Sequence, residues 1–243
     1  MIHWRSDDHS ERFRQRLFTI DVAARSVPGV LWTPSQALGP LALVLIGHGG
    51  GGHKRDESRL DLAARYTSRG LAAAAIDGPW HGERAPVGSA PTESYAPPIV
   101  DAMVADWRAT LDALIALPEI DGACVGYGGV SMGTMFGLPF VAADGRIRAA
   151  VLGLCGLQSA RGAPLEMGER LAGDARDLSA PVLFLLQWHD DVFAREGSLA
   201  LFDLIASGDK RLLANPGRHH ETPAHARAAS VDFLVTQLDA QPV

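Results

Sequence analysis

The main pattern along the chain is an alternation of short apolar runs with amphipathic stretches. The runs are rich in aliphatic residues, and several contain no polar position. Continuous apolar runs of this length are typical of strands covered on both faces, as in a parallel sheet. We predict such strands at 41–46, 71–76, 123–127, 149–154, 181–186 and 211–214.

Helical periodicity occupies several of the segments between these runs. The clearest case is a long helix that begins near Val100 and ends before Pro118, with apolar residues mostly three or four positions apart. Its expected core side chains are Val100, Val104, Trp107, Leu111, Leu114 and Ile115. Further helices are expected at 60–69, after residue 131, at 196–206 and at the end of the chain, whereas 155–179 has an irregular pattern.

The start of the chain has a different pattern. Two short strands, 16–23 and 29–33, are separated by Pro28-Gly29, a dipeptide typical of turns. An antiparallel start is therefore predicted. A loop rich in Pro, Gly and Ser precedes the long helix and extends to Pro98.

Alternating strands and helices predict one α/β domain over residues 1–243. Buried parallel strands with helices between them imply a three-layer α/β/α sandwich around a mostly parallel sheet. In such folds the functional residues collect in loops at the carboxyl ends of the strands. We also expect a short cap over these loops, formed by 158–177.

Composition narrows the range of partners. The chain of 243 residues is 47% hydrophobic and 21% charged, with a formal net charge of −6. It has no basic excess for binding nucleic acid and no apolar run long enough to cross a membrane. Cys124 and Cys155 lie in apolar runs, as reduced thiols often do, and residues 1–16 lack the apolar core of a secretory signal. We therefore expect a cytoplasmic protein.

One serine lies where a nucleophile would be placed. Residues 129–133 read Gly-Val-Ser-Met-Gly, between a predicted strand and a predicted helix. Glycines two positions before and after Ser131 suit a sharp turn whose side chain must project clear of the backbone. Because the chain has 26 glycines, this pattern also arises by chance in ordinary loops. The order of its partners decides between the two interpretations.

An acid and a base follow in the required order. Gln-Trp-His-Asp-Asp at 187–191 comes directly after the strand 181–186, and Asn-Pro-Gly-Arg-His-His-Glu at 215–221 comes after the last predicted strand. The order of nucleophile elbow, acid and late histidine resembles the α/β-hydrolase fold family, over nearly the whole chain. Within that family, His-Gly-Gly-Gly at 48–51 and Asp-X-X-X-His-Gly at 77–82 resemble bacterial esterases close to the dienelactone hydrolases.

This resemblance implies specific roles. Asp190 matches the family's Gly-X-X-Asp position, although Gln187 replaces the glycine, and is preferred over Asp191 as the acid. His219 matches the Gly-X-His pattern, and His220 is the alternative base. For the oxyanion site, the backbone N–H of the residue after the nucleophile, Met132, is one expected donor. Gly50, at the family's position after His-Gly, is the other.

Competing interpretations match the sequence less well. The glycine run 47–52 resembles a phosphate-binding loop, but His53 stands where the lysine is required. A dinucleotide fingerprint starting at Gly126 would need glycine at position 131. No His-X-X-X-His or Cys-X-X-Cys spacing prepares a metal site, so His48 and His81 are expected to brace loops by hydrogen bonds.

The combined expectation is a serine esterase that acts through an acyl-enzyme, with no metal and no cofactor. The resemblance favours small or medium, largely apolar carboxylic esters. Thioesters, peptidase-like acyl transfer and ligand binding without catalysis are the alternatives. The candidates for a pocket wall are Trp80, Met132, Leu157 and Trp188. No surface element predicts an oligomeric state.

Overall fold

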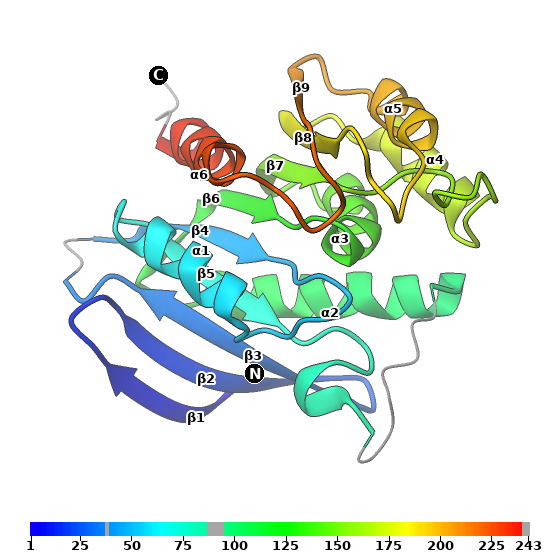
Figure 1. Ribbon diagram of the computed structural model, residues 1–243. Helices are drawn as coiled ribbons and strands as arrows, with labels where there is room; N and C mark the ends of the chain where they lie inside the picture. The colour runs from blue at the N-terminus through cyan, green and yellow to red at the C-terminus, as the bar shows by residue number, and fades with distance from the viewer. Residues whose placement is uncertain (37–38, 87–94, 240–243) are drawn as a thin grey trace.

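The computed structural model describes residues 1–36, 39–86 and 95–239, and a nine-stranded sheet forms the centre of this part of the chain (Figure 1). The strand order is β1-β2-β3-β5-β4-β6-β7-β8-β9. The strands are β1 (Ile2–His9), β2 (Arg14–Val22), β3 (Arg25–Thr33), β4 (Leu41–Ile46), β5 (Ala72–Ile76), β6 (Ile120–Gly128), β7 (Ile147–Gly153), β8 (Val182–Gln187) and β9 (Lys210–Asn215).

The sheet is parallel from β5 to β9 and antiparallel at its beginning. Strands β5, β4, β6, β7, β8 and β9 pair in parallel, while β1, β2 and β3 pair antiparallel and β3 joins β5. Both the antiparallel start and the mostly parallel remainder confirm the sequence prediction.

Helices cover both faces of the sheet. They are α1 (Glu57–Thr67), α2 (Pro97–Ile115), α3 (Met132–Ala143), α4 (Gly168–Asp177), α5 (Arg195–Leu204) and α6 (Ala224–Asp239), with a 3₁₀ turn η1 (Gly82–Arg84). Core residues of α1 and α6 pack on one face, and those of α2, α3, α4 and α5 pack on the other (Figure 1). This arrangement is the predicted three-layer α/β/α sandwich.

The central strands are apolar on both sides because each side meets a separate core. In β4, Leu43 and Leu45 belong to the core under α2 and α3, while Val44 and Ile46 belong to the core under α1 and α6. All four side chains are fully buried. Side chains alternate across a strand, so a strand between two helix layers requires an unbroken apolar run.

The predicted turn at Pro28-Gly29 is wrong. Both residues lie inside β3, and the chain reverses earlier, at residues 23–24, where Ala23 has a φ of 51°. Gly29 serves packing instead. A Cβ at this position would lie 2.2 Å from the ring of Phe18, its partner on β2. The glycine therefore makes room for a buried aromatic ring.

Two elements differ from the sequence prediction. Strand β1 is missing from it because this edge strand has no fully buried residue and shows no apolar alternation. Helix α4 occupies part of the segment 155–179, for which the sequence predicted no regular element. Only Leu171 and Ala175 on this helix are buried, so few apolar positions mark it in the sequence. It packs against α3 and α5. Of the predicted loop that ends at Pro98, residues 87–94 lie outside the described residues.

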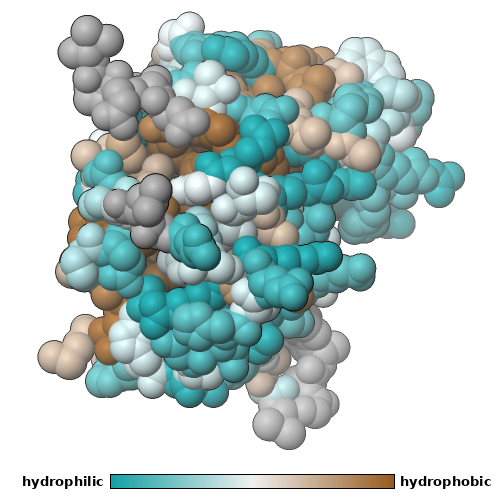
Figure 2. Space-filling view, turned by 90° about the vertical axis from the view of Figure 1, so that its left-hand side faces the viewer, coloured by the Kyte–Doolittle hydropathy of each residue, from teal (hydrophilic) through white to brown (hydrophobic). Residues whose placement is uncertain are grey.

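Polar side chains cover much of the face at the left of Figure 1, with hydrophobic patches between them (Figure 2). No helix in the described ranges is long and apolar enough to cross a membrane. Cys124, in β6, and Cys155, just after β7, are both buried and unpaired, as the sequence predicts.

Candidate active site

Ser131 occupies a strained turn between β6 and α3. Its φ of 58° and ψ of −123° place a non-glycine residue in a region that L-amino acids rarely adopt. The backbone holds this conformation from both sides. The N–H of Ser131 donates to the carbonyl of Gly153 (2.9 Å), and its own carbonyl accepts from the N–H groups of Thr134 (2.8 Å) and Met135 (3.0 Å).

Close neighbours leave little room for a side chain at either glycine around Ser131. A Cβ on Gly129 would lie 2.8 Å from the hydroxyl of Tyr127, and one on Gly133 would lie 3.3 Å from the backbone of Gly47. Tyr127 in turn donates its hydroxyl to the carbonyl of Gly133 (2.7 Å). The predicted steric role of these glycines is thus visible in the structure.

Thr134, which the sequence prediction missed, ties the turn to the sheet. Its hydroxyl lies 2.9 Å from the carbonyl of Gly129 and 2.8 Å from that of Gly153, and it accepts from the N–H of Gly153 at 2.8 Å. The side chain therefore joins the first turn of α3 to the ends of β6 and β7. Its position three residues after the serine is a signal that could have identified it.

His219 reaches Ser131 from the loop after β9. Its Nε2 lies 2.9 Å from the Oγ of Ser131, and its side chain is only 4% exposed. The alternative, His220, is exposed and packs edge-on against His219 with ring centroids 4.9 Å apart. The side chain of Gln187 donates to the carbonyl of Arg218 (3.3 Å) and helps to hold this loop.

Asp190 holds the other side of the imidazole. Its Oδ2 lies 2.8 Å from the Nδ1 of His219, and its Oδ1 accepts from the N–H groups of Val192 (2.8 Å) and Phe193 (3.0 Å). Burial opposes ionisation of this carboxyl, but the hydrogen bonds from His219, Phe193 and Val192 outweigh it and lower the pKa of Asp190. The carboxylate form is therefore favoured.

These contacts determine where the proton of His219 lies. A carboxylate accepts hydrogen bonds only, so the Nδ1 of His219 carries hydrogen toward Asp190. The Nε2 is then free to accept the hydroxyl proton of Ser131. A serine oxygen paired with a basic, oriented imidazole is able to attack an electrophilic carbon.

Two buried histidines hold the glycine loop after β4, as the sequence predicts. The Nε2 of His48 accepts from the N–H of Gly78 (2.8 Å), so its Nδ1 donates to the carbonyl of Gly49 (2.9 Å). Burial lowers the pKa of His48 to about 4, which keeps the ring neutral near pH 7. His81 contacts the carbonyl of Gly50.

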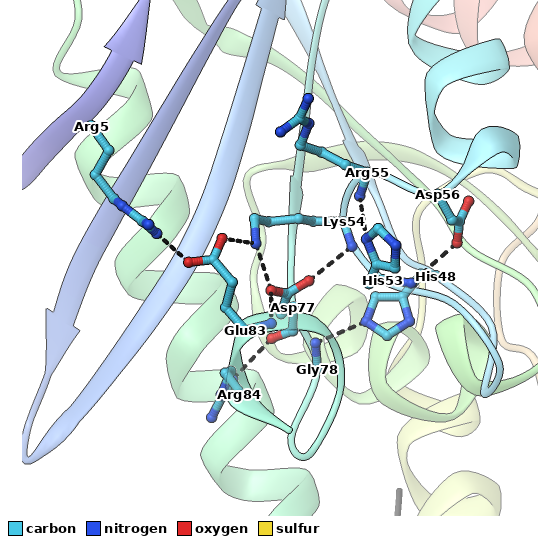
Figure 3. Close-up of polar contacts among 10 residues, drawn as sticks. All are labelled: Arg5, His48, His53, Lys54, Arg55, Asp56, Asp77, Gly78, Glu83 and Arg84. Carbon is cyan, nitrogen blue, oxygen red and sulfur yellow. Dashed lines mark hydrogen bonds and ion pairs between the residues drawn. The ribbon is translucent and has the colours of Figure 1, made fainter. Parts of the chain in front are cut away.

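An ion-pair network anchors the far end of the same loop (Figure 3). The Nζ of Lys54 lies 2.6 Å from Asp77 and 2.6 Å from Glu83, and the Lys54 and Asp77 side chains are 4% and 0% exposed. Glu83 also pairs with Arg5, from β1. Arg84 donates to the carbonyl of Asp77 (3.0 Å). The glycine loop is thus joined to β5, η1 and the edge strand.

Two cavities meet at Ser131. The larger, about 720 Å³, lies beside the glycine loop and α1, and the smaller measures about 500 Å³. Both are lined by Ser131, His219, His220, Gly50 and Gly51. The side chains that line only the smaller cavity are mostly apolar: Tyr95, Met135, Leu165, Met167, Val192 and Phe193, with Ser159 and Glu166.

The expected pocket wall is not the lining of these cavities. Trp80, Leu157, Trp188 and Met132 line neither of them. Trp188 is 43% exposed and lies against the guanidinium of Arg195, while the side chain of Met132 is buried. These four residues lie close in sequence to the expected active-site loops. Such closeness does not show which apolar side chains face a cavity. Within the described residues, no three His, Cys, Asp or Glu side chains gather as a metal site would require.

Several solved esterases resemble this structure. A cold-adapted esterase from an Arctic intertidal metagenomic library, in a PEG-bound complex, is 37% identical with a TM-score of 0.85, and the match covers 98% of this chain and 100% of that one. An acetyl xylan esterase from Paenibacillus sp. R4 is 17% identical (TM-score 0.78; 98% and 88% covered). Est1E from Butyrivibrio proteoclasticus, with bound ferulic acid, is 17% identical (TM-score 0.70; 90% and 98% covered).

No sequence-family model matches the chain, and no curated protein does. The two more distant likenesses show the fold alone. The esterase at 37% identity shows more, because it matches essentially the full length of both chains. The chain therefore belongs to the α/β-hydrolase fold family and is an enzyme that hydrolyses carboxylic esters.

Proposed function

We propose that this enzyme is a serine esterase in which Ser131 is the nucleophile, His219 the general base and Asp190 the acid that orients it. The observation that carries this proposal is the hydrogen-bonded series of the three side chains, with 2.9 Å between Ser131 and His219 and 2.8 Å between His219 and Asp190. The backbone strain at Ser131 supports it, since strained residues cluster at catalytic sites.

The proposed reaction has two halves. His219 takes the hydroxyl proton as the Oγ of Ser131 attacks the ester carbon, and then gives it to the leaving alcohol. Water, activated by the same imidazole, then attacks the acyl-enzyme and releases the acid. Asp190 stabilises the imidazolium that forms in both halves. The charge on the tetrahedral oxygen is stabilised by the backbone N–H groups of Gly50 and Met132.

The two cavities support an ester with two unlike arms. The apolar lining of the smaller one suits a small or medium apolar group. The larger cavity has a more polar border that includes Asp56, Arg59 and Arg227. Its occupant would carry polar groups. Segment 158–177 contributes Ser159 and residues 165–167 to the smaller cavity, so we retain the proposal that it caps the site.

Labelling with a fluorophosphonate probe tests the proposal directly. The probe reacts with an activated serine, so mass spectrometry should find it on the peptide that contains Ser131. The Ser131→Ala variant should fold normally, fail to react and lose about 10⁴- to 10⁶-fold of its kcat toward p-nitrophenyl acetate. The matched control is Ser159→Ala, which removes a hydroxyl from the border of the smaller cavity. Labelling at another residue, or turnover by Ser131→Ala, would refute the assignment.

A further inference from the structure

Both ring nitrogens of His81 face carbonyl oxygens. The Nδ1 lies 2.7 Å from the carbonyl of Pro79, and the Nε2 lies 2.6 Å from that of Gly50. The residue is 3% exposed. Carbonyl oxygens accept hydrogen bonds and do not donate them, so each of these contacts requires an N–H on the ring.

Only the imidazolium form carries hydrogen on both nitrogens. A neutral ring would leave one nitrogen lone pair directed at a carbonyl oxygen within 2.7 Å, an unfavourable contact in a buried site. His48, with ring centroid 5.1 Å away, shows the contrast, because one of its nitrogens faces an N–H and the other a carbonyl. The structure thus holds one neutral histidine beside one that is placed to be a cation.

The two rings hold consecutive peptide groups of the glycine loop. His48 holds the carbonyl of Gly49, and His81 holds that of Gly50. In a trans peptide the carbonyl and the following N–H point in opposite directions, so these bonds orient the N–H groups of Gly50 and Gly51. Both glycines line the cavities beside Ser131. The carbonyl of Gly49 also accepts from the N–H of Gly52 (3.0 Å), so the rings add to a turn that the backbone itself closes.

We propose that His81 is a positioning residue that acts as an imidazolium: it fixes the peptide that follows Gly50, and so holds in place the glycine whose N–H we assign to the oxyanion site. This inference rests on the proposed function of Ser131. A side chain with a single donor at this position would hold only one of the two carbonyls. Turnover would then fall although the hydrogen bonds among Ser131, His219 and Asp190 are intact.

Charged groups on the turn after β5, on the glycine loop and on α1 act on this pair of histidines. Asp77 begins the turn, and its carboxylate accepts from the backbone N–H and Nζ of Lys54 and from the N–H of Glu83. Burial dominates the lowered pKa of His48. The hydrogen bond to Gly49 and the charge of Asp77 raise this pKa, whereas the charges of His81 and Arg59 lower it further. Arg59, on α1, also donates to the carbonyl of Gly47 (3.3 Å).

Side-chain NMR of the enzyme labelled with ¹⁵N-histidine measures the protonation state directly. At the pH of maximal activity, we expect the His81 ring to show two equivalent protonated nitrogens and the His48 ring to show one protonated and one bare nitrogen. A singly protonated His81 ring at the pH of maximal activity would overturn the proposal.

Kinetics of His81→Gln provide the second measurement, with His53→Gln as the control because His53 is an exposed histidine of the same loop. Gln keeps one donor in place of two. We expect His81→Gln to lower kcat about 10- to 100-fold with KM nearly unchanged. A folded variant with wild-type kcat would refute the role. If the variant fails to fold, the NMR result on the wild type decides.

Fluorophosphonate labelling separates this proposal from the proposed function. If the probe does not react with Ser131, the proposed function is wrong whatever the state of His81. If the probe reacts with Ser131 but the His81 ring is neutral, only the positioning role is wrong.

Discussion

His219 and Asp190 are joined side chain to side chain, with 2.8 Å between Nδ1 and Oδ2. The adjacent Asp191 meets the same histidine differently, since its Oδ1 accepts from the backbone N–H at 3.2 Å. One acid orients the ring, and the other orients the loop that carries it. The structure therefore favours Asp190, which the resemblance also preferred.

Replacing Asp190 by Asn should lower kcat by about 10⁴-fold. The amide carries no negative charge to stabilise an imidazolium. Its oxygen should keep accepting from the N–H groups of Val192 and Phe193, so its NH₂ would face the Nδ1 of His219 and favour the wrong tautomer. Steady-state hydrolysis of p-nitrophenyl acetate measures the effect. Asp191→Asn is the matched control, with an expected loss of less than about tenfold, because only one loop hydrogen bond weakens. Equal losses in the two variants would contradict the assignment of the acid.

The burial of His48 makes stability depend on pH. The folded state lowers the pKa of His48 from 6.5 to about 4, so between these values the unfolded chain binds a proton that the folded chain does not. This contribution is fully present above pH 6.5 and is lost as the pH falls toward 4, by about 3 kcal/mol in total.

The His48→Gln variant isolates that contribution, because Gln can still accept from Gly78 and donate to Gly49 but does not titrate in this range. Urea unfolding at pH 7, 6, 5 and 4 should show a shallower loss of stability in the variant than in the wild type. Parallel pH curves would show that His48 is protonated equally well in both states.

Removing Lys54 should destabilise the fold more than removing an exposed cation. Lys54→Met leaves the fully buried carboxylate of Asp77 without its ionic partner, which costs about 3–5 kcal/mol. The control is Arg65→Met, which breaks an exposed pair with Asp61 in α1 and should cost less than about 0.5 kcal/mol. Urea denaturation of both variants gives the comparison, and similar free energies of unfolding would argue against a structural role for the Lys54 pair.

A methyl group at Gly29 should be poorly tolerated. The Cβ of Gly29→Ala would lie 2.2 Å from the buried Phe18 ring, so the ring or the strand must move, at a cost of about 1–3 kcal/mol or more. Gly173→Ala in α4 has open space around the new Cβ and should be neutral or slightly stabilising. Thermal unfolding followed by circular dichroism distinguishes the two, and a Gly29→Ala chain as stable as the wild type would contradict the packing argument.

Elements with a strong apolar signature could be predicted from the sequence, and others could not. Strand β4 was predicted with its observed bounds because both faces are buried. Strand β1 has no fully buried residue, and the short, highly charged helix α4 buries only Leu171 and Ala175, so neither contains the run of apolar positions on which the prediction relied. The prediction of a turn at Pro28-Gly29 was wrong for another reason. Local turn preference competed there with the packing of Phe18, and the tertiary contact prevailed.

The candidate active site likewise contains residues that could be predicted from the sequence and residues that could not. Ser131, Asp190 and His219 were named because their chain order and local motifs are encoded in short segments, and the structure brings all three side chains together. The cavity lining was not foreseen. Whether a side chain such as Met135 or Phe193 faces the cavity depends on how α3 and the loop after β8 pack, which the order of residues does not reveal.

The bent backbone at Ser131 has a consequence for the durability of the enzyme. Holding a serine at a φ of 58° costs on the order of 1–3 kcal/mol, which the rest of the fold must offset. Glycine adopts this conformation without strain, so a chain with Gly at position 131 would be inert yet more resistant to heat. If Ser131 is the nucleophile we propose, this residue exchanges thermal robustness for reactivity.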